Sequence, residues 1–264
     1  MSRSRTPNKY MLNAKRESQV TLLHAGEVDR IPRIVHAFST RRAERSDFSL
    51  GPVTSPNPMI QMNRVRFFAA MGAPGWPVLK LKQVHSGIVR EMDDTWAASE
   101  AQEGDAAITN LPGALLAVQT ADCVPILIAH AAARGIAAIH AGWRGTAARI
   151  TEKTVQRLVS KYEIDPAELY AVIGPHIGVC CYEVGEDVVE AIGDPELLER
   201  RPEWPKPHFN LLEANRRQLL QTGVLPEHIE TTTLCTRCRA DLFFSYRRDG
   251  ESTGRLLSAI GIEP

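Results

Sequence analysis

The sequence predicts an α+β fold of the mixed α/β kind, a single layered domain in which mixed β-sheets are flanked by helices. Three observations support this prediction. Several short apolar runs have the length of strands, and their unbroken hydrophobicity is typical of strands covered on both faces. Other stretches repeat apolar residues at helical spacing. The two kinds of element mix without strict alternation, which favours mixed sheets over a doubly wound parallel sheet.

The first half of the chain contains one predicted helix among predicted strands. Residues 34–40 form the first strand. A helix opens at Asn57-Pro58 and ends near Gly72, because asparagine is a favoured N-cap and proline fits the first helical turn. Four later segments are also predicted strands: 78–84 and the apolar runs 114–119, 123–130 and 135–140. The first of them alternates in polarity, which places Leu79, Leu81, Gln83 and His85 on one face.

The second half begins with a change of period. Between residues 146 and 162 apolar side chains fall on one helical stripe, and Thr146 is a suitable N-cap. Two more helices are predicted over 185–192 and over 210–221, and the second of them ends before Gly223. The remaining predicted strands are 169–173, 229–234, 242–246 and 254–262.

Composition and charge narrow the classes of partner. The 264 residues carry 31 Lys+Arg and 31 Asp+Glu, so the formal net charge is zero and predicts neither a nucleic-acid partner nor a membrane surface. No apolar run approaches the ~20 residues of a membrane span. Five cysteines without a visible secretory signal predict reduced thiols and a cytoplasmic location. We expect a poorly ordered arm over residues 1–30 and one domain over 31–264, and the oligomeric state is not indicated.

Two motifs place a thiol and an imidazole at the ends of strand-like runs. Cys123 lies in Thr120-Ala-Asp-Cys-Val-Pro125, and His140 lies in Ile139-His-Ala-Gly-Trp-Arg-Gly145. Upstream, Lys82-Gln-Val-His-Ser86 supplies His85. Two imidazoles and one thiolate form a zinc set that leaves a tetrahedral ion one open position, as in catalytic zinc sites. A water bound at that position can be activated near neutral pH.

The same three residues allow other chemistry. Copper also binds a set of two histidines and one cysteine, so it is the alternative ion. However, no methionine near them in sequence supplies an axial ligand, and the eight histidines include no His-x-His pair of the kind that multicopper oxidases use. Zinc is therefore preferred. Alternatively, Cys123 is a nucleophile with His85 or His140 as its base.

Other polar residues carry weaker signals. Arg144, next to the predicted helix, could hold a phosphate, because helix N-termini and arginines both attract anions. Asp105 and Asp122 are expected to make turn and strand-end hydrogen bonds rather than to transfer protons. The four remaining cysteines are Cys180, Cys181, Cys235 and Cys238. We expect them to be free thiols without metal, because adjacent cysteines chelate one tetrahedral ion poorly.

Several stretches, taken together, form a specific pattern from about residue 36 to the C-terminus. Besides the Cys123 and His140 motifs, they are Phe38-Ser-Thr-Arg41, Lys82-Gln-Val-His85, Gly104-Asp-Ala106, Ile173-Gly-Pro175, Cys181-Tyr-Glu-Val-Gly185, Phe244-Ser-Tyr-Arg-Arg-Asp-Gly250 and Thr253-Gly-Arg255. The pattern resembles the peptidoglycan-editing-factor family, also called laccase-domain or polyphenol-oxidase-like proteins and purine nucleoside phosphorylases. The resemblance also implies one layered domain of mixed sheets flanked by helices.

By this resemblance, the protein is a zinc-dependent purine nucleoside phosphorylase acting on adenosine, inosine and methylthioadenosine, with adenosine deamination as a second activity. The residues then expected to bind zinc and carry catalysis are His85, Cys123 and His140. Those expected to contact the nucleoside or phosphate are Arg41, Gln83 and Arg144. Two alternatives stay open. One is a hydrolase that edits a peptidoglycan precursor with zinc-activated water or a Cys123 nucleophile, and the other is a zinc-binding protein without turnover.

One stretch departs from the family pattern. The family usually carries a Gly-Gly-Val/Ile-Ser loop soon after the Ser-Thr-Arg motif, whereas here Arg41 is followed by Arg42-Ala-Glu-Arg-Ser-Asp47. That loop lies near the substrate region of the family. The nucleoside that this chain prefers therefore stays open.

Overall fold

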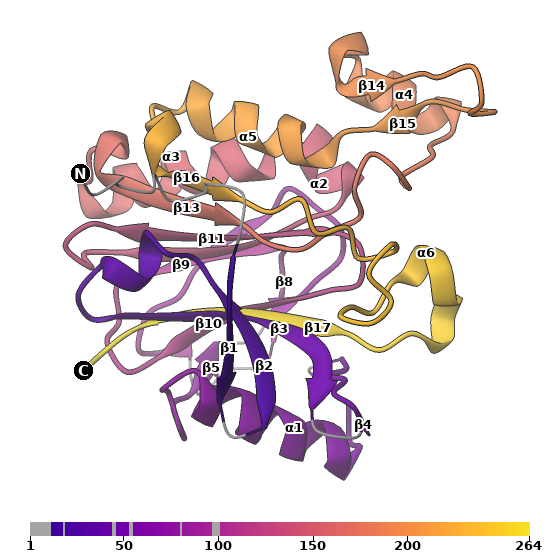
Figure 1. The fold of residues 1–264 in the computed structure, drawn as a ribbon. Helices are drawn as coiled ribbons and strands as arrows, with labels where there is room; N and C mark the ends of the chain where they lie inside the picture. Colours follow the sequence, from indigo (N-terminus) through magenta and orange to yellow (C-terminus); the bar gives the residue numbers. More distant parts are fainter. Residues whose placement is uncertain (1–11, 18, 44–45, 53–54, 80, 97–100) are drawn as a thin grey trace, which may run out of the picture.

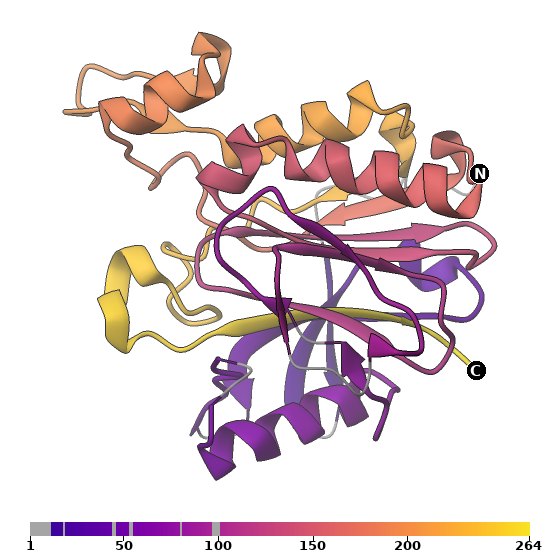
Figure 2. The ribbon, with the colours of Figure 1, turned by 180° about the vertical axis from the view of Figure 1, so that it is seen from behind.

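The chain folds into two β-sheets that pack face to face, with helices on both outer faces (Figure 1). The view from behind shows the same succession of helix, sheet, sheet and helix (Figure 2). This is the mixed α+β class that the sequence predicts. The structure is a computed structural model and describes residues 12–17, 19–43, 46–52, 55–79, 81–96 and 101–264. Within these residues, no helix has both the length and the apolar character needed to cross a bilayer.

The first sheet joins segments from both ends of the chain. Within the described residues its strand order is β1-β2-β3-β17-β10-β5, and β4 pairs with β3. Only the β5–β10 pair is parallel among these strands. The strands are β1 Asn13–Glu17, β2 Val20–His24, β3 Ile34–Ala43, β4 Ser46–Asp47, β5 Val78–Leu79, β10 Leu115–Thr120 and β17 Leu256–Ile262. Because β17 lies between β3 and β10, the C-terminal strand joins the two halves of this sheet.

The second sheet is built around a β11–β12 hairpin. Its order among the described residues is β16-β13-β11-β12-β9-β7, and the β13–β16 and β7–β9 pairs are parallel. The strands are β7 Val89–Glu91, β9 Ala106–Thr109, β11 Val124–His130, β12 Ile136–Ala141, β13 Leu169–Ile173 and β16 Ile229–Thr231. Two further pairs stand apart: β6 Leu81–Lys82 with β8 Gln102–Glu103, and β14 Leu198–Glu199 with β15 His208–Phe209.

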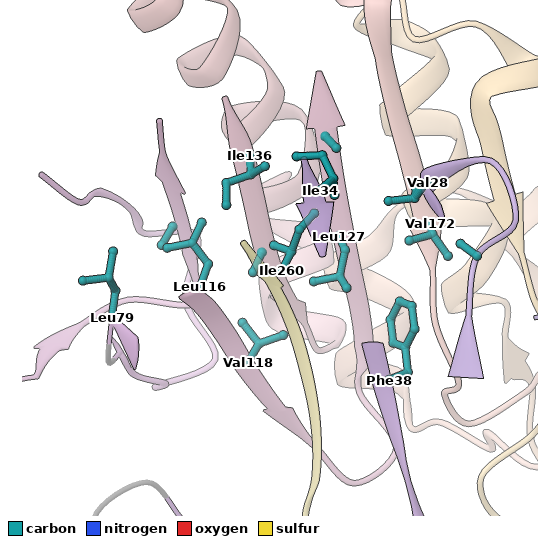
Figure 3. Close-up of a cluster of buried hydrophobic side chains, with 14 of the residues drawn as sticks. Val28, Ile34, Phe38, Leu79, Leu116, Val118, Leu127, Ile136, Val172 and Ile260 are labelled. Atoms are coloured by element: carbon teal, nitrogen blue, oxygen red, sulfur yellow. The ribbon is translucent and has the colours of Figure 1, made fainter. Parts of the chain in front are cut away.

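The main hydrophobic core lies between the two sheets (Figure 3). Phe38, Leu116 and Ile260 enter it from the first sheet, and Leu127 and Val172 enter from the second. Each of these side chains is at most 1% exposed. Burying one such side chain contributes about 1.5–3 kcal/mol. Every residue of β11 and β12 is buried, which confirms the prediction that these apolar runs are covered on both faces.

Three helices cover the outer faces of the sheets. α1 (Pro58–Ala70) packs Phe67 and Phe68 on the first sheet, and the Asn57 side chain accepts a hydrogen bond from the Met59 amide at 2.9 Å, as the predicted cap requires. α3 (Ile150–Tyr162) and α5 (Leu211–Gln221) cover the second sheet. The shorter helices are α2 Trp143–Ala147, α4 Glu186–Ile192 and α6 Tyr246–Asp249, and 3-10 turns span Val28–Arg30, Pro166–Glu168, Pro195–Leu197, Pro226–His228 and Gly250–Ser252.

The predicted N-terminal arm is partly strand. Residues 1–11 lie outside the described residues, but Asn13–Glu17 and Val20–His24 form β1 and β2 at the edge of the first sheet. All five residues of β1 are exposed, and three of them are charged. Edge strands commonly carry charged side chains, and so does a disordered tail. The composition of this segment therefore does not distinguish an edge strand from a tail. The arm prediction is therefore wrong for these two strands.

Three other predicted elements differ from the structure. The helix over 146–162 is two helices, α2 and α3, because Arg149 between them has a left-handed φ of 58°. The strand over 78–84 is divided, since β5 pairs with β10 whereas β6 pairs with β8. The strand over 242–246 is absent from this described segment. There the Ser245 hydroxyl accepts from the Arg248 amide and so caps α6.

Stability should fall with acidity because of one buried histidine. His36 Nε2 accepts a hydrogen bond from the Ala25 amide at 2.9 Å, and the neighbouring charged or titratable groups are Asp29, His24 and Lys15. Burial, together with the charge of His24, lowers the pKa of His36 to about 3, from 6.5. His36 therefore binds a proton near pH 6.5 in the unfolded chain, but it stays neutral at that pH in the folded chain.

The His36 contribution is fully present above pH 6.5 and is lost as the pH falls below it. Between pH 7 and pH 5 we expect the free energy of unfolding to drop by about 2 kcal/mol. Urea denaturation at both pH values measures the drop. The control is His36→Gln, which keeps an acceptor for Ala25 but cannot titrate. An equal drop in that variant would assign the effect to other groups.

Candidate active site

A cavity of about 710 Å³ opens where the turn between β10 and β11 meets the loop after β6 and the segment around α6. It brings together residues from many parts of the chain. The lining residues are Pro52, Leu81, Lys82, Gln83, His85, Gln119, Thr120, Ala121, Asp122, Cys123, His140, Ile177, Tyr182, Tyr246, Arg247 and Arg255. Both motifs that the sequence singles out therefore open into one cavity.

His85, Cys123 and His140 converge on one wall of the cavity. The ligand atoms of all three lie within 4.8 Å of one another, and the two imidazole rings are 4.8 Å apart between centroids. Gly142 makes this approach feasible, because a Cβ there would lie 3.0 Å from His85 Cδ2 and 3.1 Å from Cys123 Sγ. His85 itself has a left-handed φ of 59°, a conformation that residues with a Cβ rarely adopt.

Asp105 orients both histidines from behind. Its carboxylate, fully buried, accepts hydrogen bonds from the His85 amide at 2.9 Å, from the Ser86 amide at 2.6 Å and from the Ser86 hydroxyl at 2.7 Å. It also accepts from the Val84 amide at 3.3 Å and pairs with His140 Nδ1 at 2.8 Å. The bond to Nδ1 makes Nε2 of His140 the nitrogen that would offer its lone pair to a metal once the ring is neutral. Although burial alone would raise it, these hydrogen bonds lower the pKa of Asp105 to about 2.

Cys123 and His140 form a charge pair. Burial opposes charge on both groups, but their mutual attraction and their hydrogen bond are stronger. They lower the pKa of Cys123 to about 6 and raise the pKa of His140 to about 9. The sulfur is thus a thiolate near neutral pH, which is the form that binds metals and attacks electrophiles.

Asp122 holds the turn that presents Cys123. This residue has a φ of 93° and is 8% exposed. Its carboxylate accepts from the Thr236 hydroxyl at 2.6 Å, the Ser245 hydroxyl at 3.0 Å and the Arg247 amide at 2.7 Å. The sequence-based expectation of hydrogen bonding is therefore confirmed for both Asp105 and Asp122, although their partners come from distant segments.

The three residues predicted to contact nucleoside or phosphate are placed differently. Gln83 lines the cavity, and its amide exchanges two 2.8 Å hydrogen bonds with the backbone of Gln119. Arg41 lies outside the lining and pairs with Asp47 through two hydrogen bonds of 2.9 and 2.6 Å. Arg144 is exposed, and its guanidinium lies 4.2 Å from the centre of the Trp143 ring. The departure from the family loop includes residues 44–45, which lie outside the described residues.

Two arginines and two tyrosines are among the lining residues that were not singled out from the sequence. Arg247 donates to the Glu183 carbonyl at 2.9 Å and lies over the ring of Tyr182, whereas Arg255 donates to the Thr253 and Gly254 carbonyls at 3.0 and 3.2 Å. The other two are Tyr182 and Tyr246. All four belong to quoted motifs, but spacing alone does not tell Arg247 from its neighbour Arg248, whose guanidinium binds Asp249 and backbone carbonyls.

Known proteins resemble the chain over most of its length. It is 38% identical over 247 residues to the purine nucleoside phosphorylase of Deinococcus radiodurans, a match that covers 87% of this chain and 89% of that protein. It is 36% identical over 192 residues to a protein of an unknown prokaryotic organism, adenosine deaminase RL5, covering 68% and 72%. The crystal structure of YlmD from Geobacillus stearothermophilus matches with a TM-score of 0.85 and 30% identity over 96% of this chain and 100% of that one.

A family model also matches the chain from β3 to the end of β17. The model describes a multi-copper polyphenol oxidoreductase laccase, and the match spans residues 35–263, which contain every residue of the candidate site. The fold agrees with this match, since the YlmD structure superposes over nearly the whole chain. The protein therefore belongs to the multi-copper polyphenol oxidoreductase laccase family, as the motifs around His85, Cys123 and His140 predict.

Proposed function

We propose that this protein is a purine nucleoside phosphorylase that holds a zinc ion with His85, Cys123 and His140. The observation that carries the proposal is the convergence of these three side chains on the wall of a cavity that also presents Arg247 and Arg255. The activity named for the Deinococcus radiodurans relative supports the reaction type.

The donor set fits zinc. Two imidazoles and one thiolate match the mixed nitrogen and sulfur ligands that zinc accepts, and three protein ligands leave one position open. Asp105 behind His140 is the carboxylate partner that metal-bound histidines usually have. When bound, zinc would supply a Lewis acid at the cavity wall. A copper oxidase is less well supported, because no methionine is among the residues found to line the cavity and the chain has no His-x-His pair.

The other cavity residues suit a nucleoside and phosphate. In phosphorolysis, a phosphate oxygen bonds to C1′ of the ribose while the bond from C1′ to purine N9 breaks. The purine leaves with that electron pair and takes up a proton. Arg247 and Arg255 would hold the phosphate dianion, because both line the cavity and guanidinium groups bind phosphate through paired hydrogen bonds. Tyr182 and Tyr246 would supply aromatic surface to the purine, because both line the cavity.

Phosphate binding is expected to depend on the two cavity arginines. A hydrogen bond to a charged group contributes about 1.5–3 kcal/mol, so Arg247→Ala and Arg255→Ala should each raise the KM for phosphate by about 10- to 100-fold. The KM for adenosine should change much less. Initial rates at varied phosphate concentration measure both constants. The sequence alone suggests Arg41 and Arg144 for this role, so a larger effect of Arg144→Ala would favour that assignment.

Product analysis tests the proposed reaction. Adenosine incubated with the protein should give adenine and ribose 1-phosphate, and only when phosphate is present. Deamination is the second candidate, supported by the name of the RL5 relative and by the metal-binding set, and it would give inosine and ammonia without phosphate. If the protein bound zinc but catalysed neither phosphorolysis nor deamination, the result would support the alternative of a zinc-binding protein without turnover. Release of an amino acid from a peptidoglycan precursor would support the editing alternative.

A further inference from the structure

A second cluster of sulfur ligands lies away from the His85 centre. Its members are Cys180, Cys181, Cys235 and Cys238, whose sulfur atoms all lie within 4.8 Å of one another. Cys180 Sγ is 3.7 Å and Cys181 Sγ is 3.4 Å from Cys238 Sγ. Zinc–sulfur bonds of about 2.3 Å in a tetrahedron set the sulfurs about 3.8 Å apart. Disulfide-bonded sulfurs would be about 2.05 Å apart, and all five cysteines are free.

Two tight turns allow the four sulfurs to meet. The first turn is closed by a hydrogen bond from the Cys181 amide to the Gly178 carbonyl at 2.9 Å, and so the adjacent Cys180 and Cys181 both reach one point. In an extended strand these neighbours would point to opposite faces, whereas this turn brings both sulfurs to the Cys238 side chain. The second turn has Cys-x-x-Cys spacing and is closed by a 3.0 Å hydrogen bond from the Arg239 amide to the Cys235 carbonyl.

The surroundings of the sulfurs match a thiolate centre. The Gly178 amide donates to Cys235 Sγ at 3.2 Å, and Arg237 Nη1 lies 3.5 Å from Cys181 Sγ. Both contacts offset negative charge on sulfur. Gly178 also gives the space, because a Cβ there would lie 3.2 Å from Cys180 Sγ and 3.3 Å from Cys235 Cβ. By contrast, the third group of metal-ligand residues, around Asp29, already contains the Lys15 ammonium 2.7 Å from that carboxylate.

We propose that Cys180, Cys181, Cys235 and Cys238 form a second metal site, a closed structural zinc centre. Four thiolates select a soft ion such as zinc over magnesium or calcium and leave no open position for a substrate. This four-cysteine site is therefore structural, and it is independent of whether the His85 centre is catalytic.

The location of the four-cysteine site explains what it would stabilise. It joins two turns that are 57 positions apart in the sequence. The first turn lies between Ile177 and Tyr182, which line the cavity, and the second contains Thr236, which donates to Asp122 next to Cys123. Zinc at the four-cysteine site would thus fix one wall of the active-site cavity.

Metal analysis of the purified full-length protein tests the proposal. We expect about two zinc ions per chain in the parent, and about one in Cys238→Ser, which replaces an exposed ligand of the four-cysteine site. The matched control is Cys123→Ser, which should also retain about one zinc ion, held by the four-cysteine site. The Cys123→Ser, Cys238→Ser double variant should retain none. Loss of metal from Cys123→Ser alone, with no change in Cys238→Ser, would overturn the proposal.

A measurement on the parent protein alone provides a second test. With the protein folded, the exposed thiols of Cys180 and Cys238 should react slowly with a disulfide reagent, and they should react fast once a chelator has removed the metal. Fast reaction before chelation would mean free thiols. Each disulfide removes two hydrogens from the protein. An intact mass that is lower than the fully reduced mass by two or four hydrogens would therefore indicate one or two disulfides and a redox site. Either result would refute a zinc centre, and neither depends on phosphorylase activity.

Discussion

Cys123→Ala and His140→Ala are each expected to lower kcat/KM for adenosine phosphorolysis by about 10³-fold. This corresponds to about 4 kcal/mol of transition-state stabilisation, the range that a metal centre supplies. Each substitution removes one of three converging ligand atoms. His140→Ala also leaves the buried Asp105 carboxylate without its partner at 2.8 Å. Steady-state kinetics together with zinc content measure the effect, and rate and metal should be lost together.

A buried histidine outside the cavity provides the control. His130 is 2% exposed, lies at the opposite end of β11 from Cys123, and contacts the Ala132 amide and Glu168. We expect His130→Ala to change kcat/KM by no more than about threefold, because distant sites act nearly independently. Parent-like phosphorolysis by Cys123→Ala without bound zinc would refute the metal mechanism. A covalent adduct on Cys123, seen as a mass increase with substrate, would favour the nucleophile alternative.

The elements that could be predicted from the sequence are those with local causes. Asn57-Pro58 carries its own cap, and the apolar runs at β10, β11 and β12 are short and uninterrupted, so their positions follow from side chains within each segment. The missing strand at 242–246 has a non-local cause. Ser245, in that stretch, binds Asp122, which lies 123 positions away. The pattern of apolar and polar residues within 242–246 does not reveal such a long-range contact.

The candidate site shows the same division. His85, Cys123 and His140 could be selected because each combines a ligand-type side chain with the end of a strand-like run, and the structure brings the three side chains together. The cavity arginines could not be selected, since the sequence does not tell which guanidinium faces the cavity. The sequence predicts no metal at the four clustered cysteines, because adjacent cysteines chelate one tetrahedral ion poorly. Their sequence spacing does not record that the Gly178 turn meets the Cys235 segment, which lies 57 positions away.

Asp122→Ala is expected to produce the largest loss of stability among single substitutions at the cavity. The carboxylate is the acceptor for Thr236, Ser245 and the Arg247 amide, and both hydroxyl-bearing residues are fully buried. Leaving buried donors without their charged acceptor costs about 3–5 kcal/mol. Alanine would also have to adopt the φ of 93°, a strained conformation for any residue with a Cβ. Urea denaturation measures the change in the free energy of unfolding.

Two further substitutions separate the two causes of this loss. Asp122→Asn keeps an acceptor oxygen, so it should cost only about 1–2 kcal/mol. Asp122→Gly relieves the backbone strain but removes every acceptor, and so it should fall between the asparagine and alanine variants. Equal stability of the alanine and asparagine variants would show that the three hydrogen bonds contribute little. Because Cys123 follows directly in the chain, kcat/KM should decrease in the same order, from asparagine through glycine to alanine, as the turn loses its anchors.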